Sequence, residues 1–333
     1  MEKTRIAVIG LGGIAQLVHL PILSKMNHVE ITAVSDIQKS KLESIKSKYG
    51  ISKGYSNYKE LLENEDIDAV VITTPTNTHA QIAVDCLKAK KHLLIEKPIA
   101  PSYKEAKLIN DTAKKNKRLV MVGMNLRFRP DAMLIKSLIN SGEFGDLFYV
   151  NCGWIRKQSS DEKWFLKKSE SGGGVLIDLG IVLLDLAIWL LDYPPIKTIS
   201  VQTFSQRTKS VEDSAVGFIR FKNSSVLNFE VSWSLHSEHD SFNLSAFGSE
   251  GTAHLNPLKA YRRVESTRID YTPPQAGNPK HLFKKSFENE INHFIGAVRG
   301  INPLLSSSED ALVRMKLLEG IYKSAELNKE IEF

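Results

Sequence analysis

The sequence predicts an α/β protein in which a Rossmann-type, doubly wound parallel sheet precedes a C-terminal α/β domain with a large, mostly antiparallel open sheet. Short apolar runs alternate with helical patterns in the first third of the chain, as a parallel sheet requires. The first of these runs ends in a glycine-rich turn. Beyond about residue 123, strand-like segments alternate apolar and polar side chains instead. We therefore expect two domains, at residues 1–123 and 124–333, and the C-terminal helices of the second can pack back on the first.

The glycine-rich turn has the residue types that a dinucleotide requires. The first apolar run leads into Gly10-x-Gly12-x-x-Ala15, and a helical pattern follows. Gly10 permits a tight turn, Gly12 lets the backbone approach a pyrophosphate, and Ala15 lets the helix pack closely on the strand. The second apolar run ends in Asp36, where a carboxylate accepts hydrogen bonds from a ribose and repels a 2′-phosphate. This pattern predicts that the chain binds NAD in preference to NADP.

Two polar clusters follow predicted strands of this domain. We expect helices at about 13–24, 38–49, 58–63, 78–90 and 103–117, and further strands at 69–72, 92–95 and 119–122. The segments Thr73–His79 and Glu96–Pro98 come directly after two of those strands. Ligands of such sheets bind beyond the carboxyl ends of the strands. A second interpretation of the first cluster is structural, because Pro75 stiffens the loop and Asn77 or Thr78 can cap the next helix.

The second domain begins with a turn at 141–146 and a strand from residue 147. Gly172-Gly173-Gly174 opens a long apolar helix that reaches Leu191, and two prolines stop it. In the strand that follows, Leu227, Phe229, Val231 and Trp233 share one face, whereas Asn228, Glu230 and Ser232 share the other. Helices at 286–299 and 308–327 end the chain.

Composition indicates a globular enzyme. Of the 333 residues, 42% are hydrophobic and 25% are charged, which are ordinary globular values. No apolar stretch approaches the length of a membrane span, and glycines break the run after Lys3 and Arg5, so we expect no membrane association and a cytoplasmic location. Two cysteines, Cys86 and Cys152, provide no disulfide framework. The lysines behind the net charge of +6 are dispersed, which is compatible with an anionic substrate but not with nucleic acid.

Five segments in order resemble the Gfo/Idh/MocA family over essentially the whole chain. They are the Gly10/Gly12/Ala15 turn, Thr74–His79, Glu96–Pro98, Gly123–Phe128 and Ser171–Gly180. The resemblance implies a nicotinamide-dependent enzyme that oxidises or reduces a carbon of a sugar, cyclitol or nucleotide-sugar, assembled as a homodimer or homotetramer. It implies that residues 1–123 form the dinucleotide-binding domain and residues 124–333 the substrate-binding and oligomerisation domain. It further implies that Lys97 and Asp178 are the catalytic lysine and aspartate.

The expected contacts follow from the turn and the resemblance together. Cofactor contacts are expected from Gly10, Gly12, Gly13, Ile14, Ala15, Asp36, Thr74, Pro75, Asn77, His79, Glu96, Lys97, Asn125 and Arg127. Substrate contacts are expected from Lys97, Arg127, Trp164, Asp178 and Val182. Oxidation of a secondary alcohol needs a group that takes the hydroxyl proton, and Lys97 can do so as a neutral amine or stabilise the alkoxide as an ammonium.

One position departs from the family pattern. The family commonly reads Asp-x-Gly-x-His-x-x-Asp after the triple glycine, but here Val182 occupies the histidine position between Asp178 and Asp185. Three hypotheses follow. Lys97 acts with Asp178 alone, or another group replaces the histidine, with His236, His239 and Tyr149 as candidates. In the third, the chain has lost turnover and binds NAD as a sensor or partner protein.

The other histidines and tryptophans carry weaker indications. His19 and His79 are expected to pack or cap near the turn, and His79 also matches the family loop. The residues around His236 and His239 do not amount to a metal site, so no metal is expected. Trp164 can stack on a sugar ring, and the basic residues beside it suggest an anionic sugar. Trp154 is at least as well explained by sheet packing.

Overall fold

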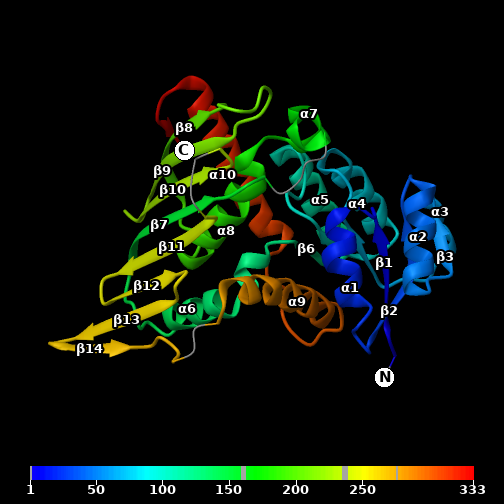
Figure 1. Cartoon of the computed structure of the whole chain (residues 1–333), viewed down its shortest axis with the longest axis horizontal. Helices are drawn as coiled ribbons and strands as arrows, with labels where there is room; N and C mark the ends of the chain where they lie inside the picture. The colour runs from blue at the N-terminus through cyan, green and yellow to red at the C-terminus, as the bar shows by residue number, and fades with distance from the viewer. Residues whose placement is uncertain (1, 159–162, 235–238, 275–276) are drawn as a thin grey trace. The chain divides into compact units, whose positions relative to one another are not determined.

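The computed structural model describes residues 2–158, 163–234, 239–274 and 277–333, and these divide into two compact units. The first unit runs to Gly123 and also includes Phe287–Leu312. The second comprises Met124–Ser286 and Val313–Phe333. Figure 1 traces both units in chain order.

The first unit has a six-stranded parallel sheet in the order β3-β2-β1-β4-β5-β6. Its strands are β1 (Thr4–Ile9), β2 (Val29–Ser35), β3 (Lys53–Tyr55), β4 (Ala69–Ile72), β5 (His92–Ile95) and β6 (Val120–Val122). This order reverses direction beside β1, which creates the crevice where doubly wound sheets bind ligands. The predicted Rossmann sheet is confirmed.

Most helices of the first unit agree with the sequence pattern. They are α1 (Leu20–Leu23), α2 (Lys39–Tyr49), α3 (Tyr58–Asn64), α4 (His79–Lys88) and α5 (Tyr103–Asn116), with short helical turns η1 (Ala15–His19) and η2 (Thr76–Thr78). The helix after the glycine turn begins as the π-helical η1 and continues as α1. Thr78 lies at the N-cap of α4, but its side chain makes no capping bond. Thr78 Oγ1 bonds instead to the Pro75 carbonyl and to Thr74 Oγ1, each at 2.7 Å.

The second unit has a nine-stranded sheet in the order β14-β13-β12-β11-β7-β10-β9-β8-β15. The strands are β7 (Leu147–Ile155), β8 (Ile196–Phe204), β9 (Ser214–Phe221), β10 (Val226–Ser232), β11 (Ser241–Gly248), β12 (Gly251–Leu255), β13 (Lys259–Val264), β14 (Thr267–Asp270) and β15 (Ile331–Glu332). All neighbours are antiparallel except β7 and β10. The large, mostly antiparallel sheet is thereby confirmed.

The remaining helices are α6 (Pro130–Asn140), α7 (Lys168–Ser171), α8 (Ile181–Leu190), α9 (Pro279–Val298) and α10 (Ser308–Leu327), with the turns η3 (Asn125–Phe128), η4 (Lys163–Leu166) and η5 (Leu176–Gly180). Helix α9 begins at Pro279, earlier than the predicted Ser286. Proline suits the first turn of a helix, where its missing N–H leaves no bond unmade.

One face of the nine-stranded sheet is covered by helices, and the other carries none in Figure 1. Leu227, Phe229 and Val231 are buried on the covered face, whereas Asn228 and Glu230 are exposed, as predicted. Ser232 was expected to be exposed with them and is instead buried. Its hydroxyl lies 2.7 Å from Ser214 Oγ, which satisfies it away from water.

The apolar segment after the triple glycine forms the core of the second unit. Every residue of α8 is buried, as expected for a helix that is apolar all round. The segment Lys168–Leu190 has 23 residues and contains an 18-residue window with a mean hydropathy of 2.1, so it is long and apolar enough to cross a membrane by length and composition alone. This corrects the expectation that no segment approaches that length. Its apolar window is wholly buried, as in the core helix of a globular unit.

Candidate active site

The turn after β1 leaves room for a ligand at its second and third glycines. Gly10 has φ of +91°, and a Cβ there would lie 2.8 Å from backbone atoms of Thr73 and Thr74, so only glycine fits. A Cβ on Gly12 or Gly13 would meet no atom within 4 Å. The chain thus needs Gly10 for its own packing, while Gly12 and Gly13 face open space of the kind that a pyrophosphate approaches.

Asp36 lies directly beside this turn. Its Oδ2 accepts from the Leu11 N–H and its Oδ1 from the Gln38 N–H, both at 2.7 Å. The two bonds hold the carboxylate at the carboxyl end of β2, and its remaining lone pairs can accept from a ribose diol. These residues therefore fit NAD.

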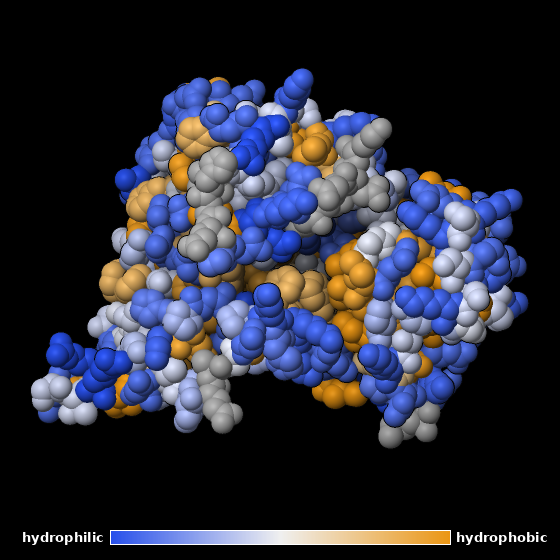
Figure 2. All heavy atoms as spheres, in the orientation of Figure 1, coloured by the Kyte–Doolittle hydropathy of each residue, from blue (hydrophilic) through white to orange (hydrophobic). Residues whose placement is uncertain are grey.

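Large apolar side chains flank the same turn. Leu17 is 81% exposed, and Ile37, the neighbour of Asp36, is 87% exposed. Figure 2 shows hydrophobic atoms gathered over the part of the molecule that Figure 1 labels α1. Exposed apolar side chains beside a few convergent polar groups are typical of a small-molecule site.

Two buried histidines connect the polar clusters of the first unit. His79 Nε2 lies 2.8 Å from the Thr74 carbonyl and Nδ1 lies 2.9 Å from the Pro98 carbonyl. Burial lowers the pKa of His79, so the neutral ring donates to one of these oxygens. His19 Nε2 lies 2.7 Å from Glu96 Oε1. The loops after β4 and β5 and the helix after the glycine turn are thus held together.

Glu96 is the centre of this arrangement. Burial alone would raise the pKa of its carboxyl, but the bond from His19 and the charge of Lys97 keep that pKa below its ordinary value. A Cβ on Gly123 would come within 3.3 Å of the carboxylate, so a glycine there allows the close approach. Glu96 stays ionised and anchors the half-buried Lys97 at the carboxyl end of β5.

In the second unit, Asp178 lies in the π-helical turn η5 and is 3% exposed. Trp233 Nε1 donates to its Oδ2 at 3.1 Å. The Trp233 ring lies 5.7 Å from the Phe165 ring, which in turn lies 5.5 Å from Trp164 in an edge arrangement. Asp178 is therefore joined to a row of three aromatic side chains, of which the sequence predicted only Trp164. π-helical turns are frequent at functional sites.

The triple glycine and Glu212 position this turn. Glu212 Oε1 accepts from the N–H groups of Gly174 and Leu176 at 2.8 and 3.1 Å, and from the Tyr322 hydroxyl at 2.9 Å. A Cβ on Gly174 would lie 1.9 Å from the Glu212 carbonyl oxygen, which explains the glycine. Burial raises the pKa of Glu212. No local pattern marks Glu212, and sequence reasoning missed it.

The guanidinium of Arg127 forms a buried ion pair and does not face a ligand. Its Nε and Nη2 donate to the two carboxylate oxygens of Asp185 at 2.7 and 2.5 Å, and Arg314 Nη1 donates to the same carboxylate at 2.7 Å. All three side chains are at most 2% exposed. We correct the prediction that Arg127 contacts cofactor or substrate, because its guanidinium is committed to a buried ion pair. Asn125 Nδ2 similarly donates to Ser286 Oγ at 2.9 Å.

Comparisons with known proteins decide the family. A profile described as "Oxidoreductase family, NAD-binding Rossmann fold" matches residues 4–124, and one described as "GFO/IDH/MocA C-terminal domain" matches residues 133–254. The chain belongs to the Gfo/Idh/MocA family. It is an NAD-dependent oxidoreductase that acts on CH–OH groups.

Relatives and structures agree over the full length. The chain is similar to D-glucoside 3-dehydrogenase of Escherichia coli (strain K12), with 28% identity covering 98% of this chain and 97% of that protein. Myo-inositol 2-dehydrogenase of Thermotoga maritima is 26% identical, with 98% of each chain covered. The fold is similar to that of levoglucosan dehydrogenase in complex with NADH, at a TM-score of 0.87 and 20% identity, covering 99% of both chains.

The Gfo/Idh/MocA pattern places its histidine at Val182, which here is 4% exposed among the apolar residues of α8. Of the proposed replacements, Tyr149 is wrong. It pairs with Val226 across β7 and β10 and stacks on Phe247 at 5.2 Å, on the sheet face opposite that of Trp233 and Asp178. His239 is exposed, and His236 lies outside the described residues.

Trp154 and the lysines of the basic stretch make packing and ion-pair contacts within the protein. Trp154 is 7% exposed and packs edge-on against Phe242 at 5.2 Å, in agreement with sheet packing. In the basic stretch, Lys167 pairs with Glu170 at 2.9 Å and Lys168 lies over the Tyr322 ring. Among the described residues no group of three or more His, Cys, Asp or Glu could hold a metal ion.

Proposed function

We propose that this Gfo/Idh/MocA enzyme transfers a hydride to or from a secondary alcohol carbon of a sugar, cyclitol or nucleotide-sugar, with Lys97 and Asp178 as catalytic residues. The observation that carries the proposal is the bonding of Glu96 to His19, which fixes the segment containing Lys97 to the helix of the glycine turn. The side chain that handles the proton is thereby positioned from the same turn that cradles the cofactor.

The nicotinamide of NAD supplies the hydride acceptor when bound. Lys97, as a neutral amine, takes the proton of the reacting hydroxyl, or as an ammonium donates a hydrogen bond to the developing alkoxide. Asp178, held by Trp233 at 3.1 Å, orients a neighbouring hydroxyl of the substrate. Glu212 positions Asp178 by accepting from the N–H groups of Gly174 and Leu176 at the start of η5.

The aromatic row beside Asp178 supports a carbohydrate substrate. Phe165 lies between Trp164 and Trp233, and all three rings are partly exposed. Aromatic faces supply rigid apolar area on which the C–H faces of a sugar or cyclitol ring can pack. The case for an anionic substrate is weaker, since Lys167 is already paired with Glu170.

A panel of substrates with NAD tests this proposal. Absorbance of NADH is followed with neutral glycosides, inositols, uronates and nucleotide-sugars. We expect turnover with at least one member of the neutral or nucleotide-sugar groups, and Trp164→Ala should raise KM for that substrate more than it changes NAD affinity. Turnover only with simple aliphatic alcohols would contradict the assignment.

Cofactor choice gives a separate prediction. Because Asp36 would repel a 2′-phosphate, NAD should bind at least about tenfold more tightly than NADP. Titration of both nucleotides by tryptophan fluorescence measures this ratio, and Asp36→Ala should reduce it. Equal or tighter binding of NADP by the wild type would contradict the role of Asp36.

The alternative function is a catalytically silent NAD-binding sensor or partner protein. The observation that favours it is Val182, which places an apolar buried side chain where the family has its acid/base histidine. No turnover across the panel, combined with tight NAD binding, would select this alternative.

We also propose that the chain forms a homodimer or homotetramer through the helix-free face of its nine-stranded sheet, in the cytoplasm. On that face Val216 is 44% and Phe204 40% exposed, and Tyr149 stacks on Phe247. Two buried free cysteines, Cys86 and Cys152, support a reducing compartment.

Light scattering at micromolar concentration tests the assembly. We expect at least twice the monomer mass of 37.3 kDa, and Val216→Lys should shift the mass toward the monomer. Val313→Lys, on α10 and 38% exposed, is the control. A wild-type monomer would reject the idea and would agree with the polar residues Asn228 and Glu230 on the same face.

A further inference from the structure

A basic cavity lies at the amino ends of the parallel strands of the first unit, the opposite end of the sheet from the glycine turn. Its volume is about 520 Å³, and it includes residues at the starts of β1, β4 and β5. The cationic side chains that line it are Lys3, Arg5, Lys90, Lys91, Arg118 and Arg299. We propose that this cavity binds a small phosphate-bearing polyanion, such as a diphosphate.

The charges in the cavity do not balance. Glu2 and Asp68 are the acidic residues that line it, so six cationic groups face two carboxylates, a formal surplus of four. Asp68 is occupied by Arg5, whose Nη2 donates to it at 2.9 Å, and Arg5 also pairs with Asp66. Counting Asp66 reduces the surplus to three.

The negative C-terminal ends of nearby helices offset only part of the remaining positive charge. The cavity residues Lys90, Arg118 and Arg299 follow the C-termini of α4, α5 and α9. Each of those ends carries about half a negative charge, and together they offset roughly one and a half positive charges. Arg299 has a further interaction of its own, so it is set aside together with the end of α9. The other five cationic groups, three carboxylates and two helix ends then leave about one positive charge that a bound anion would balance.

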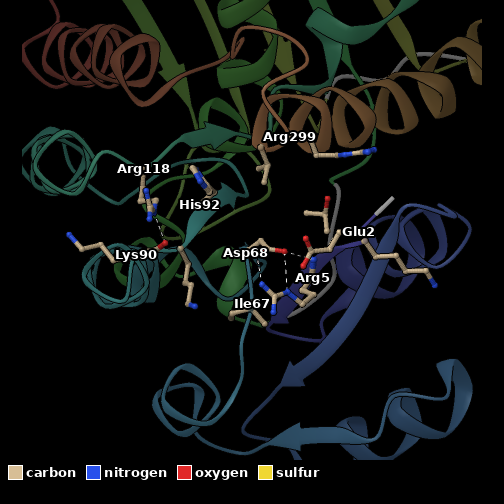
Figure 3. Close-up of a pocket in the computed structure, with 12 residues that line it drawn as sticks. Glu2, Arg5, Ile67, Asp68, Lys90, His92, Arg118 and Arg299 are labelled. Atoms are coloured by element: carbon tan, nitrogen blue, oxygen red, sulfur yellow. Dashed lines mark hydrogen bonds and ion pairs between the residues drawn. The ribbon is translucent and has the colours of Figure 1, made fainter.

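The cavity also presents fixed hydrogen-bond donors. The Leu119 N–H donates to His92 Nδ1 at 3.0 Å, so the neutral ring carries its proton on Nε2. Arg118 is held by the carbonyls of Lys90 and Lys117. Within the part of the chain that the structure describes, the Lys91 ammonium makes no hydrogen bond or ion pair. Figure 3 shows Lys90, His92 and Arg118 grouped on one side of the cavity, across from Arg5 and Asp68.

Phosphate matches this donor set better than a single carboxylate does. Guanidinium groups bind phosphate oxygens through parallel N–H bonds, and ammonium groups add mobile point charges. A cavity of about 520 Å³ has room for a diphosphate. Because the hollow is open to solvent, its affinity should fall as salt screens the charges.

Calorimetric titration of the full chain with inorganic pyrophosphate tests the site. The affinity tag is placed after Phe333 so that it is not joined to the segment of Glu2 and Lys3. NAD is saturating so that pyrophosphate cannot occupy the glycine turn. We expect one site per chain. The double variant Lys91→Met/Arg118→Gln should weaken binding at least tenfold, Lys91→Met alone at least threefold, and the exposed control Lys115→Met less than twofold.

Several outcomes would overturn the proposal. One is the absence of binding at 10 mM pyrophosphate and low salt. Another is a pyrophosphate affinity of both Lys91→Met and the double variant that equals that of the wild type. That result would mean that the anion binds elsewhere. Equal affinity for citrate would show that the site does not select phosphate. The single variant Lys91→Met keeps the test valid should the loss of Arg118 disturb the turn that it bonds.

Discussion

Replacing Lys97 with methionine is expected to lower kcat by about 10²–10⁴-fold while NAD affinity stays within about threefold of wild type. Methionine keeps the length and removes the amine that handles the hydroxyl proton. We expect NAD affinity to depend instead on Gly12, Gly13 and Asp36, which the substitution does not touch. Turnover is followed by NADH absorbance with a substrate from the panel, and NAD binding by fluorescence titration.

The matched control is Lys104→Met, because Lys104 is exposed on α5 in the same unit. It should leave both quantities unchanged. Should Lys97→Met turn over the substrate within a few-fold of wild type, the catalytic assignment of Lys97 is wrong.

The substitution Val182→His distinguishes the hypotheses for the missing histidine. If Lys97 and Asp178 are sufficient for catalysis, Val182→His should leave kcat unchanged or lower it. An imidazole in the buried apolar start of α8 would also cost about 1–3 kcal/mol of stability if left without a partner. Activity that appears only in this variant would favour the silent NAD-binding alternative.

Removing the carboxylate charge of Asp185 is expected to destabilise the second unit by about 3–5 kcal/mol. Asp185→Asn removes the negative charge that the buried guanidinium groups of Arg127 and Arg314 each meet at 2.7 Å or less in the wild type. Because a change of 1 kcal/mol moves the transition of a unit of this size by about 2–4 °C, the midpoint should fall by about 10 °C in calorimetry.

A surface aspartate gives the comparison. Asp192 is 91% exposed, lies 3.7 Å from Lys136, and has a φ of +62°, which asparagine also tolerates. Asp192→Asn should therefore change stability by less than about 0.5 kcal/mol. A thermal midpoint of Asp185→Asn equal to that of wild type would show that the buried pair is not a stabilising element.

The sequence predicted the parts of this protein whose causes are local. Gly10 is required by a positive φ, and the period-two pattern of Leu227, Phe229 and Val231 follows from a strand with one covered face. The position of Asp36 follows from its place at the end of the second strand. The family motifs added Lys97 and Asp178, which short-range patterns alone do not mark.

The contacts between those motifs were decided by the tertiary structure. His19 reaches Glu96 across 77 positions, and Arg127 reaches Asp185 across 58. Arg127 therefore has a structural place that its motif did not predict, and Glu212 caps η5 from 36 positions beyond Leu176. The two partners of such a bond are too far apart in the sequence for a local pattern to include both. Each forms because folding buries a polar group that must then find whichever donor or acceptor the packed chain brings within reach.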